Sequence, residues 1–120
     1  MILMRDNVIY DELLDVIAPA AVVKGQVALI QDVYAFYMND AAAGEEVVAV
    51  YKCRQALMDK VAESGEEIVA GDQVFYNPVT GLGSATKGVG MVFVGWAKED
   101  ALDTDEQVLI NFDGTLHQLI

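Results

Sequence analysis

Apolar and polar residues alternate over short stretches along most of the chain, and turn-forming residues separate these stretches. Such alternation is typical of strands that bury one face. We expect strands at residues 13–17, 26–31, 34–38, 46–52, 73–77, 90–98 and 106–112. Glycine and proline lie between them, most densely in "NPVTGLGSATKGVG". The pattern predicts a mainly β fold, either a small barrel or a sandwich.

One segment at 55–64, "QALMDKVAES", has a different pattern. Leu57 and Val61 lie four residues apart, as do Lys60 and Ser64, and good helix formers dominate the segment. We therefore expect one short α-helix at 55–64. Because no comparable second helical segment follows, the pattern does not favour alternating strands and helices with a parallel sheet.

Two pairs of segments resemble each other. "VVKGQVALI" matches "IVAGDQVFY", and "DAAAGEEVVAV" is echoed later by "EDALDTDEQVLI". The order of these segments predicts two related halves, with "NPVTGLGSATKGVG" as an extended loop in the second half. The alternative is that short β motifs recur by chance.

The stretch "DAAAGEE", residues 40–46, has two readings, because small residues followed by carboxylates suit either a cation site or a turn. Its counterpart in the second half favours the turn. Val48 and Val50 should then share one face of the following strand. Val47 and Ala49 should share the other face, and both glutamates should stay near solvent.

Composition and charge narrow the class of protein. A chain of 120 residues fits one domain spanning 1–120, and its apolar runs are far shorter than the ~20 residues of a membrane helix. The net charge of −12 repels phosphates, so we expect neither nucleic acid nor a membrane as a partner. The start lacks the order of a secretory signal, which predicts synthesis in a cytosol. The single Cys53 is expected to be a small core residue.

Candidate chemistry is sparse. The only histidine, His117, lies near the C-terminus without a triad around it, and "GLGSATKGVG" lacks the spacing of a phosphate loop. The best metal candidate is the acidic loop Glu99–Asp105, in which Glu99, Asp100, Asp103 and Asp105 are carboxylates. It lacks the glycine and glutamate of an EF-hand loop, which favours a solvated turn. We expect no enzyme activity, no cofactor and no metal.

Aromatic residues cluster in "VYAFYM". On a strand, Tyr34, Phe36 and Met38 share one face, and Tyr37 lies on the other. Core packing accounts for the first face, and a subunit contact is an alternative for the second, since tyrosine suits half-buried interfaces. The candidate interface residues are Tyr34, Phe36 and Tyr37.

Four segments in register carry a family resemblance: "VIAPAAVVKGQVALI", "DAAAGEEVVAV", "IVAGDQVFYNPVTG" and "VGWAKEDALDTDEQVLINFDG". Over residues 13–114 the chain resembles the capsid decoration or cement proteins of tailed bacteriophages, the group catalogued as domain of unknown function 2190. It departs from them at "YAFYM", where a glycine usually precedes the strand, and in a longer "SATKGVGMVF". These departures concern local loop geometry.

The resemblance implies a small β-barrel with no catalytic residues that binds the major capsid protein on the exterior of the virion. Decoration sites lie on symmetry axes, which implies a homotrimer or otherwise a homodimer, made in the bacterial host cytoplasm. The main alternative is a cytosolic β-barrel module that binds a small ligand or a host protein, and a hydrolase is a distant third. A closed apolar pocket would favour the ligand module.

Overall fold

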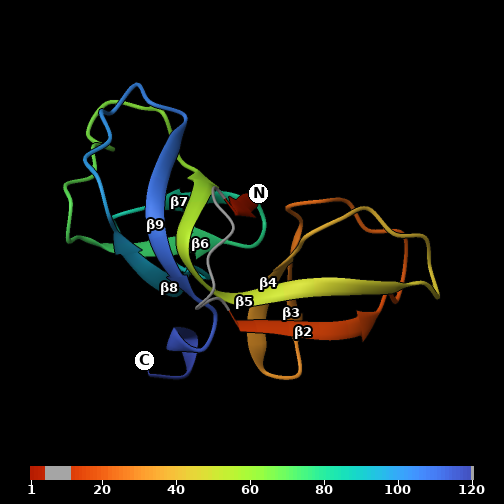
Figure 1. Ribbon diagram of the computed structural model, residues 1–120. Coiled ribbons are helices and arrows are strands. Elements are labelled where there is room, and N and C mark those ends of the chain that lie inside the picture. Colours follow the sequence, from red (N-terminus) through yellow and green to blue (C-terminus); the bar gives the residue numbers. More distant parts are fainter. Residues whose placement is uncertain (5–11, 120) are drawn as a thin grey trace.

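The computed structural model describes residues 1–4 and 12–119, and its regular structure is almost entirely β (Figure 1). The strands are β1 (Ile2–Met4), β2 (Glu12–Ile17), β3 (Val27–Ile30), β4 (Val33–Tyr37), β5 (Glu46–Asp59), β6 (Gln73–Asn77), β7 (Leu82–Ser84), β8 (Val92–Ala97) and β9 (Gln107–Asp113). A 3-10 helix, η1 (Leu116–Leu119), follows the last strand. In this part of the chain, no helix has the length and apolar character to cross a membrane.

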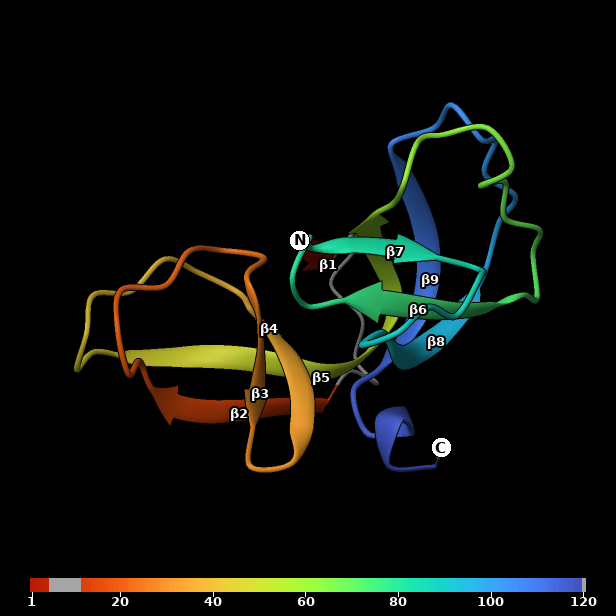
Figure 2. The ribbon, with the colours of Figure 1, turned by 180° about the vertical axis from the view of Figure 1, so that it is seen from behind.

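The strands form one antiparallel sheet in the order β3-β4-β5-β9-β8-β6-β7, and β1 and β2 also pair with β5. The long strand β5 is shared by two lobes. Its first half pairs with β2 and β4, and its second half pairs with β1 and β9. We call residues 12–52 the N-terminal lobe and residues 53–113 the C-terminal lobe; they lie at opposite ends of β5 (Figures 1 and 2).

All seven predicted strands are confirmed within a few residues, but the predicted helix at 55–64 is wrong. The segment instead extends β5 to Asp59 and then enters a turn. Burial alternates along it: Ala56 and Met58 are buried, whereas Leu57 and Asp59 are partly exposed. A spacing of four fits both a helical turn and two strand repeats, so it did not discriminate between them. Pairing with β9 selects the strand.

The two lobes repeat the same backbone hydrogen bonds, which confirms the predicted relation between the halves. In the N-terminal lobe, Val22 and Ala41 exchange N–H···O bonds of 2.9 and 3.0 Å. In the C-terminal lobe, Ile68 and Ala101 do the same at 2.9 and 2.8 Å. Each pair joins two neighbouring turns at the outer end of its lobe.

The repeat continues into the strands. Gly25 donates its N–H to the Tyr37 carbonyl at 2.8 Å, and Gly71 donates to Ala97 at the same distance. Both glycines have positive φ, 84° and 93°, which side chains with a Cβ disfavour. Counting outward from these turns, β3 corresponds to β6, β4 to β8, and the first half of β5 to β9.

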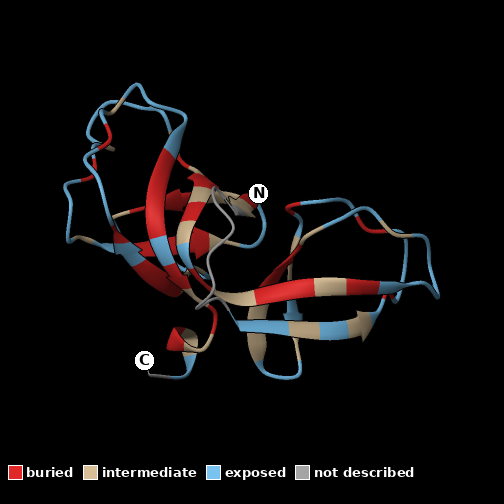
Figure 3. Ribbon diagram, viewed as in Figure 1, coloured by how far each residue is buried: buried red, intermediate tan, exposed pale blue. Residues whose placement is uncertain are grey.

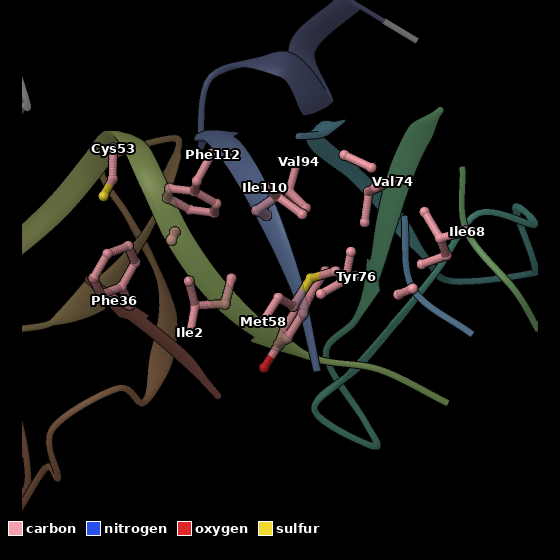
Figure 4. Packing of buried hydrophobic residues seen from close by; sticks show 14 of the residues in the cluster. Ile2, Phe36, Cys53, Met58, Ile68, Val74, Tyr76, Val94, Ile110 and Phe112 are labelled. Carbon is pink, nitrogen blue, oxygen red and sulfur yellow. The ribbon is translucent and has the colours of Figure 1, made fainter. Parts of the chain in front are cut away.

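Each lobe has its own hydrophobic cluster, and buried residues lie in both lobes (Figure 3). The smaller cluster, in the N-terminal lobe, contains Val47 and Ala49. The larger cluster fills the C-terminal lobe and reaches Ile2 and Phe36 at the junction (Figure 4). There the rings of Phe36 and Phe112 meet edge to face at 5.3 Å and join the lobes.

The lobes differ in closure. In the C-terminal lobe, the predicted extended loop contains β7, a strand that the sequence pattern did not predict; it pairs with β6 (Figure 2). Gly83 of β7 forms a parallel bridge with Lys60, and the Met1 amino group donates to the Gly81 carbonyl at 3.0 Å. These contacts close the C-terminal lobe into a small barrel. The N-terminal lobe is an open, curled sheet between β3 and β2.

Candidate interaction surface

The stretch "DAAAGEE" forms a turn at the outer end of the N-terminal lobe. The Glu45 carboxylate accepts the Ala42 N–H at 2.6 Å, and the Glu45 N–H returns to the Ala42 carbonyl at 3.1 Å. Gly44 supplies the positive φ, 88°. Glu46 is exposed. The geometry favours the turn reading over the cation reading, because the Glu45 carboxylate already has a backbone partner.

Three other turns in the two lobes contain the same kind of hydrogen bond between a side chain and the backbone. Each places a side-chain oxygen on the N–H three residues earlier: Gln26 on Val23, Asp72 on Val69 and Asp105 on Leu102. These acceptors therefore fix the turns. An amide serves as well as a carboxylate in the first of them, so the shared requirement is an oxygen acceptor rather than a charge.

The acidic loop Glu99–Asp105 also has structural contacts. Asp100 accepts the Ala70 N–H at 2.8 Å, and Asp105 accepts the Leu102 N–H at 2.8 Å. The described residues contain no group of three or more His, Cys, Asp or Glu that could hold a metal ion. The two aspartates join and shape turns in this loop.

Sequence reasoning missed the role of Lys60, because it assigned this residue to a helix. Lys60 is 3% exposed, and its ammonium donates to three backbone carbonyls: Val61 at 2.7 Å and both Leu102 and Asp105 at 3.1 Å. Three donors thus meet three acceptors, as a buried ammonium requires. The side chain holds the turn before β9 against the end of β5.

The candidate catalytic groups have structural surroundings. The His117 ring meets Tyr34 edge to face at 4.9 Å, and its Nδ1 lies 2.9 Å from the Gly114 carbonyl oxygen. Cys53 is buried, as predicted. A hydrogen bond to the Glu12 carboxylate raises the pKa of Tyr51 above its ordinary value. These neighbours do not include an activated nucleophile beside a base.

Two of the hollows on the described residues are open and lined in part by acidic side chains. One, of about 600 Å³, is lined in part by Asp59, Asp105 and Glu106. A second, of about 270 Å³, is lined in part by Asp15 and Asp40. Neither has the enclosed apolar form typical of a small-ligand pocket.

The three candidate interface residues have contacts inside the chain. Tyr34, Phe36 and Met38 lie in or against the larger cluster, and Tyr37 lies in the smaller one, so the predicted alternation is confirmed. Phe36 is 1% and Tyr37 2% exposed, whereas Tyr34 is half-buried. Burial of Tyr37 differs from the half-buried position expected of it. A subunit contact through this strand stays a prediction.

The two lobes differ in where their exposed apolar side chains lie. In the C-terminal lobe they lie mainly in turns and loops, except for Trp96 on β8: Val69, Val79, Val89, Trp96 and Leu102. In the N-terminal lobe, Val23 lies outside the strands, but Leu13, Ile17 and Leu29 lie within strands β2 and β3. Scattered apolar residues in loops need no partner, but apolar residues along open strands mark a candidate interaction surface.

The fold is mainly β, and the described surface is marked by apolar side chains along the strands of the N-terminal lobe. A family model described as phage cement protein matches residues 10–112, which include both lobes almost completely. The chain therefore belongs to the phage cement protein family, whose role in the capsid is structural. The match confirms the resemblance to cement proteins, while the catalogue number 2190 stays a prediction. No curated protein and no solved structure matches the chain.

Proposed function

We propose that this protein binds the outer surface of the assembled phage capsid, through the major capsid protein, and stabilises the lattice. The observation that carries the proposal is the family match over residues 10–112. The open, acidic hollows and the structural contacts of His117 and Lys60 support a binding role over a catalytic one.

The acidic charge supports an exterior position. A net charge of −12 is repelled by packaged nucleic acid and has no such penalty outside the shell. A protein that binds the assembled lattice but not free subunits favours assembly by mass action. Weak contacts repeated over the shell add to this effect when the protein is oligomeric.

A homotrimer, or otherwise a homodimer, fits this role because sites on a closed lattice lie on symmetry axes. Of the three candidate interface residues, Tyr34 has partly exposed area, whereas Phe36 and Tyr37 act by shaping the strand that carries it. Sedimentation equilibrium tests the oligomer, and a monomer at tens of micromolar would remove support for a preformed assembly.

The capsid role is tested with shells of the major capsid protein from the same phage, purified without this protein. The protein should sediment with the shells, occupy regular exterior positions in electron micrographs, and raise the temperature at which shells break. Unassembled capsid subunits are the control and should not bind. Protein that stays in the supernatant, or density inside the shell, would contradict the proposal.

A further inference from the structure

In the closed C-terminal lobe, strand β7 covers an edge of the sheet that would otherwise be open. In the C-terminal lobe, Phe75 of β6 pairs with Ser84 of β7, and Tyr76 pairs with Gly83. Strand β7 thus covers the edge of β6 that faces away from β8. A lobe of this kind takes one additional antiparallel strand at that edge.

Among the described residues, no strand pairs with β3 at the corresponding edge, and the Ile2 N–H meets the start of this edge at the Gly25 carbonyl, 3.0 Å away. Strand β3 corresponds to β6, but Gln31 and Asp32, with φ of 49° and 71°, turn the chain directly into β4. Tyr37 donates to the Gln26 carbonyl, so by antiparallel alternation the N–H and C=O groups of Val27 and Leu29 point away from β4. Within residues 1–4 and 12–119, these groups have no hydrogen-bond partner.

Residues of β3 that face the interior of the N-terminal lobe are also less buried than their counterparts in β6. Val74 and Tyr76 of β6 are buried, at 0% and 5% exposure. Their counterparts in β3, Ala28 and Ile30, are only partly buried. The inward face of β3 therefore keeps apolar area that the closing strand covers in the other lobe.

The two open edges are not equivalent. Strand β2 carries Asp15 in the middle of its exposed row, a charge that discourages strand addition. Strand β3, "VALI", has no charge, proline or bulge, and Leu29 is 56% exposed beside its free edge. A short, neutral, apolar edge without a cover is a template for an incoming strand.

We propose that an extended segment of the major capsid protein adds to β3 as an antiparallel strand, in the place that β7 takes in the other lobe. This inference rests on the proposed function and assigns the contact with the capsid protein to the edge of β3. Residues 12–52 carry six acids and two bases, Glu12, Asp15, Asp32, Asp40, Glu45, Glu46, Lys24 and Lys52. This charge favours a partner segment with an apolar centre and Lys or Arg at its ends over a second copy of the same acidic chain.

Hydrogen exchange of the full chain, free and bound to the shells, tests the site. Val27 and Leu29 amides should exchange quickly in the free protein and become protected on shells. Ala28 and Ile30 amides, which point toward β4, should be protected in both states. Amides of the β2 edge, such as Asp15, should not change.

A backbone variant tests the same edge by affinity. Leu29→Pro removes an outward N–H that β4 does not use, and proline is tolerated on an edge strand, so the lobe should fold. Shell binding should fall by about tenfold or more through the lost main-chain bonds. Leu29→Val keeps the N–H and should bind as the wild type does. Should the proline variant not fold, Leu29→Lys blocks the edge with a charge.

The outcomes separate this inference from the proposed function. If the wild type binds shells but β3 gains no protection and Leu29→Pro binds normally, strand addition is wrong and the capsid role stands. If the wild type does not bind shells, the capsid role itself fails. If β3 becomes protected with rising protein concentration in the absence of shells, a second copy is the occupant, and the proposal is overturned.

Discussion

Ile110 in the C-terminal lobe and Ile30 in the N-terminal lobe both point into a lobe core, but only Ile110 is fully buried. The outer turns of the two lobes share paired hydrogen bonds, between Val22 and Ala41 in one lobe and between Ile68 and Ala101 in the other. The lobes differ in whether further strands cover the sheet edge. Local sequence thus determines the turn framework, whereas barrel closure depends on segments outside the repeat. Among the described residues, no strand covers the outer edges of β2 and β3 in the N-terminal lobe.

The largest difference between the lobes is expected when each of the two isoleucines is truncated. Ile110→Ala should lower the free energy of unfolding by about 2–5 kcal/mol, because it leaves a cavity in a closed core. Ile30→Ala removes the same atoms from a partly solvated site and should cost about 1 kcal/mol. Urea denaturation measures both. Equal losses would show that the N-terminal core is as well covered as the other.

The buried ammonium of Lys60 is a second difference between the lobes, because Ala18, which makes a similar backbone hydrogen bond at the end of β2, has no such group. Lys60 donates its N–H to the Glu106 carbonyl before β9 at 2.9 Å, and Ala18 donates to the Glu45 carbonyl before β5 at 2.8 Å, but only Lys60 adds an ammonium. Lys60→Met should cost about 1–3 kcal/mol, since it leaves buried carbonyls without donors. Lys98→Met, at an exposed site in the same lobe, is the control and should stay within about 0.5 kcal/mol. If Lys60→Met leaves the free energy of unfolding unchanged, the Lys60 ammonium does not hold the turn before β9 in place.

Much of the framework was predictable from the sequence, because its signals are local. Alternation located seven strands, and the glycine turns "VVKGQ" and "IVAGD" revealed the repeat before any contact was known. The helix predicted at 55–64 was wrong, since the spacing of that segment satisfies two periods and pairing with β9 selects the strand up to Asp59. Strand β7 was hidden in a glycine-rich loop because only its neighbours, β6 and Lys60, make it a strand.

The candidate surface was less predictable. Tyr37 looked half-exposed because its strand has two apolar faces, and the second cluster that buries one of them exists only after β2 and β5 pair. The free edge of β3 has no sequence signal of its own. It follows from the short turn at Gln31 and Asp32, compared with the longer loop at the corresponding place in the other lobe.

The corresponding glycines Gly25 and Gly71 test whether lobe surroundings add to turn strain. Gly71 has open space where the methyl group of an alanine would lie, so Gly71→Ala should cost about 1–2 kcal/mol through its positive φ alone. A methyl group at Gly25 would also meet the Met1 and Leu3 side chains. Gly25→Ala should therefore cost about 1 kcal/mol more, as crowding adds to strain. Thermal melting measures both, and the reverse order would contradict the contact with β1.

The smallest effects are expected at "DAAAGEE". Glu45→Ala removes the acceptor of the Ala42 N–H and should cost about 1 kcal/mol, and Asp105→Ala should cost a similar amount at the corresponding turn. Glu45→Gln keeps an oxygen acceptor, and Glu46→Ala changes an exposed side chain, so each should stay within about 0.5 kcal/mol. Thermal melting with calcium and with chelator completes the test, because an oxygen acceptor that fixes a turn needs no cation. If chelator lowers the melting temperature of the wild type and Glu45→Gln is as damaging as Glu45→Ala, charge at this position is essential and the stretch is a cation site.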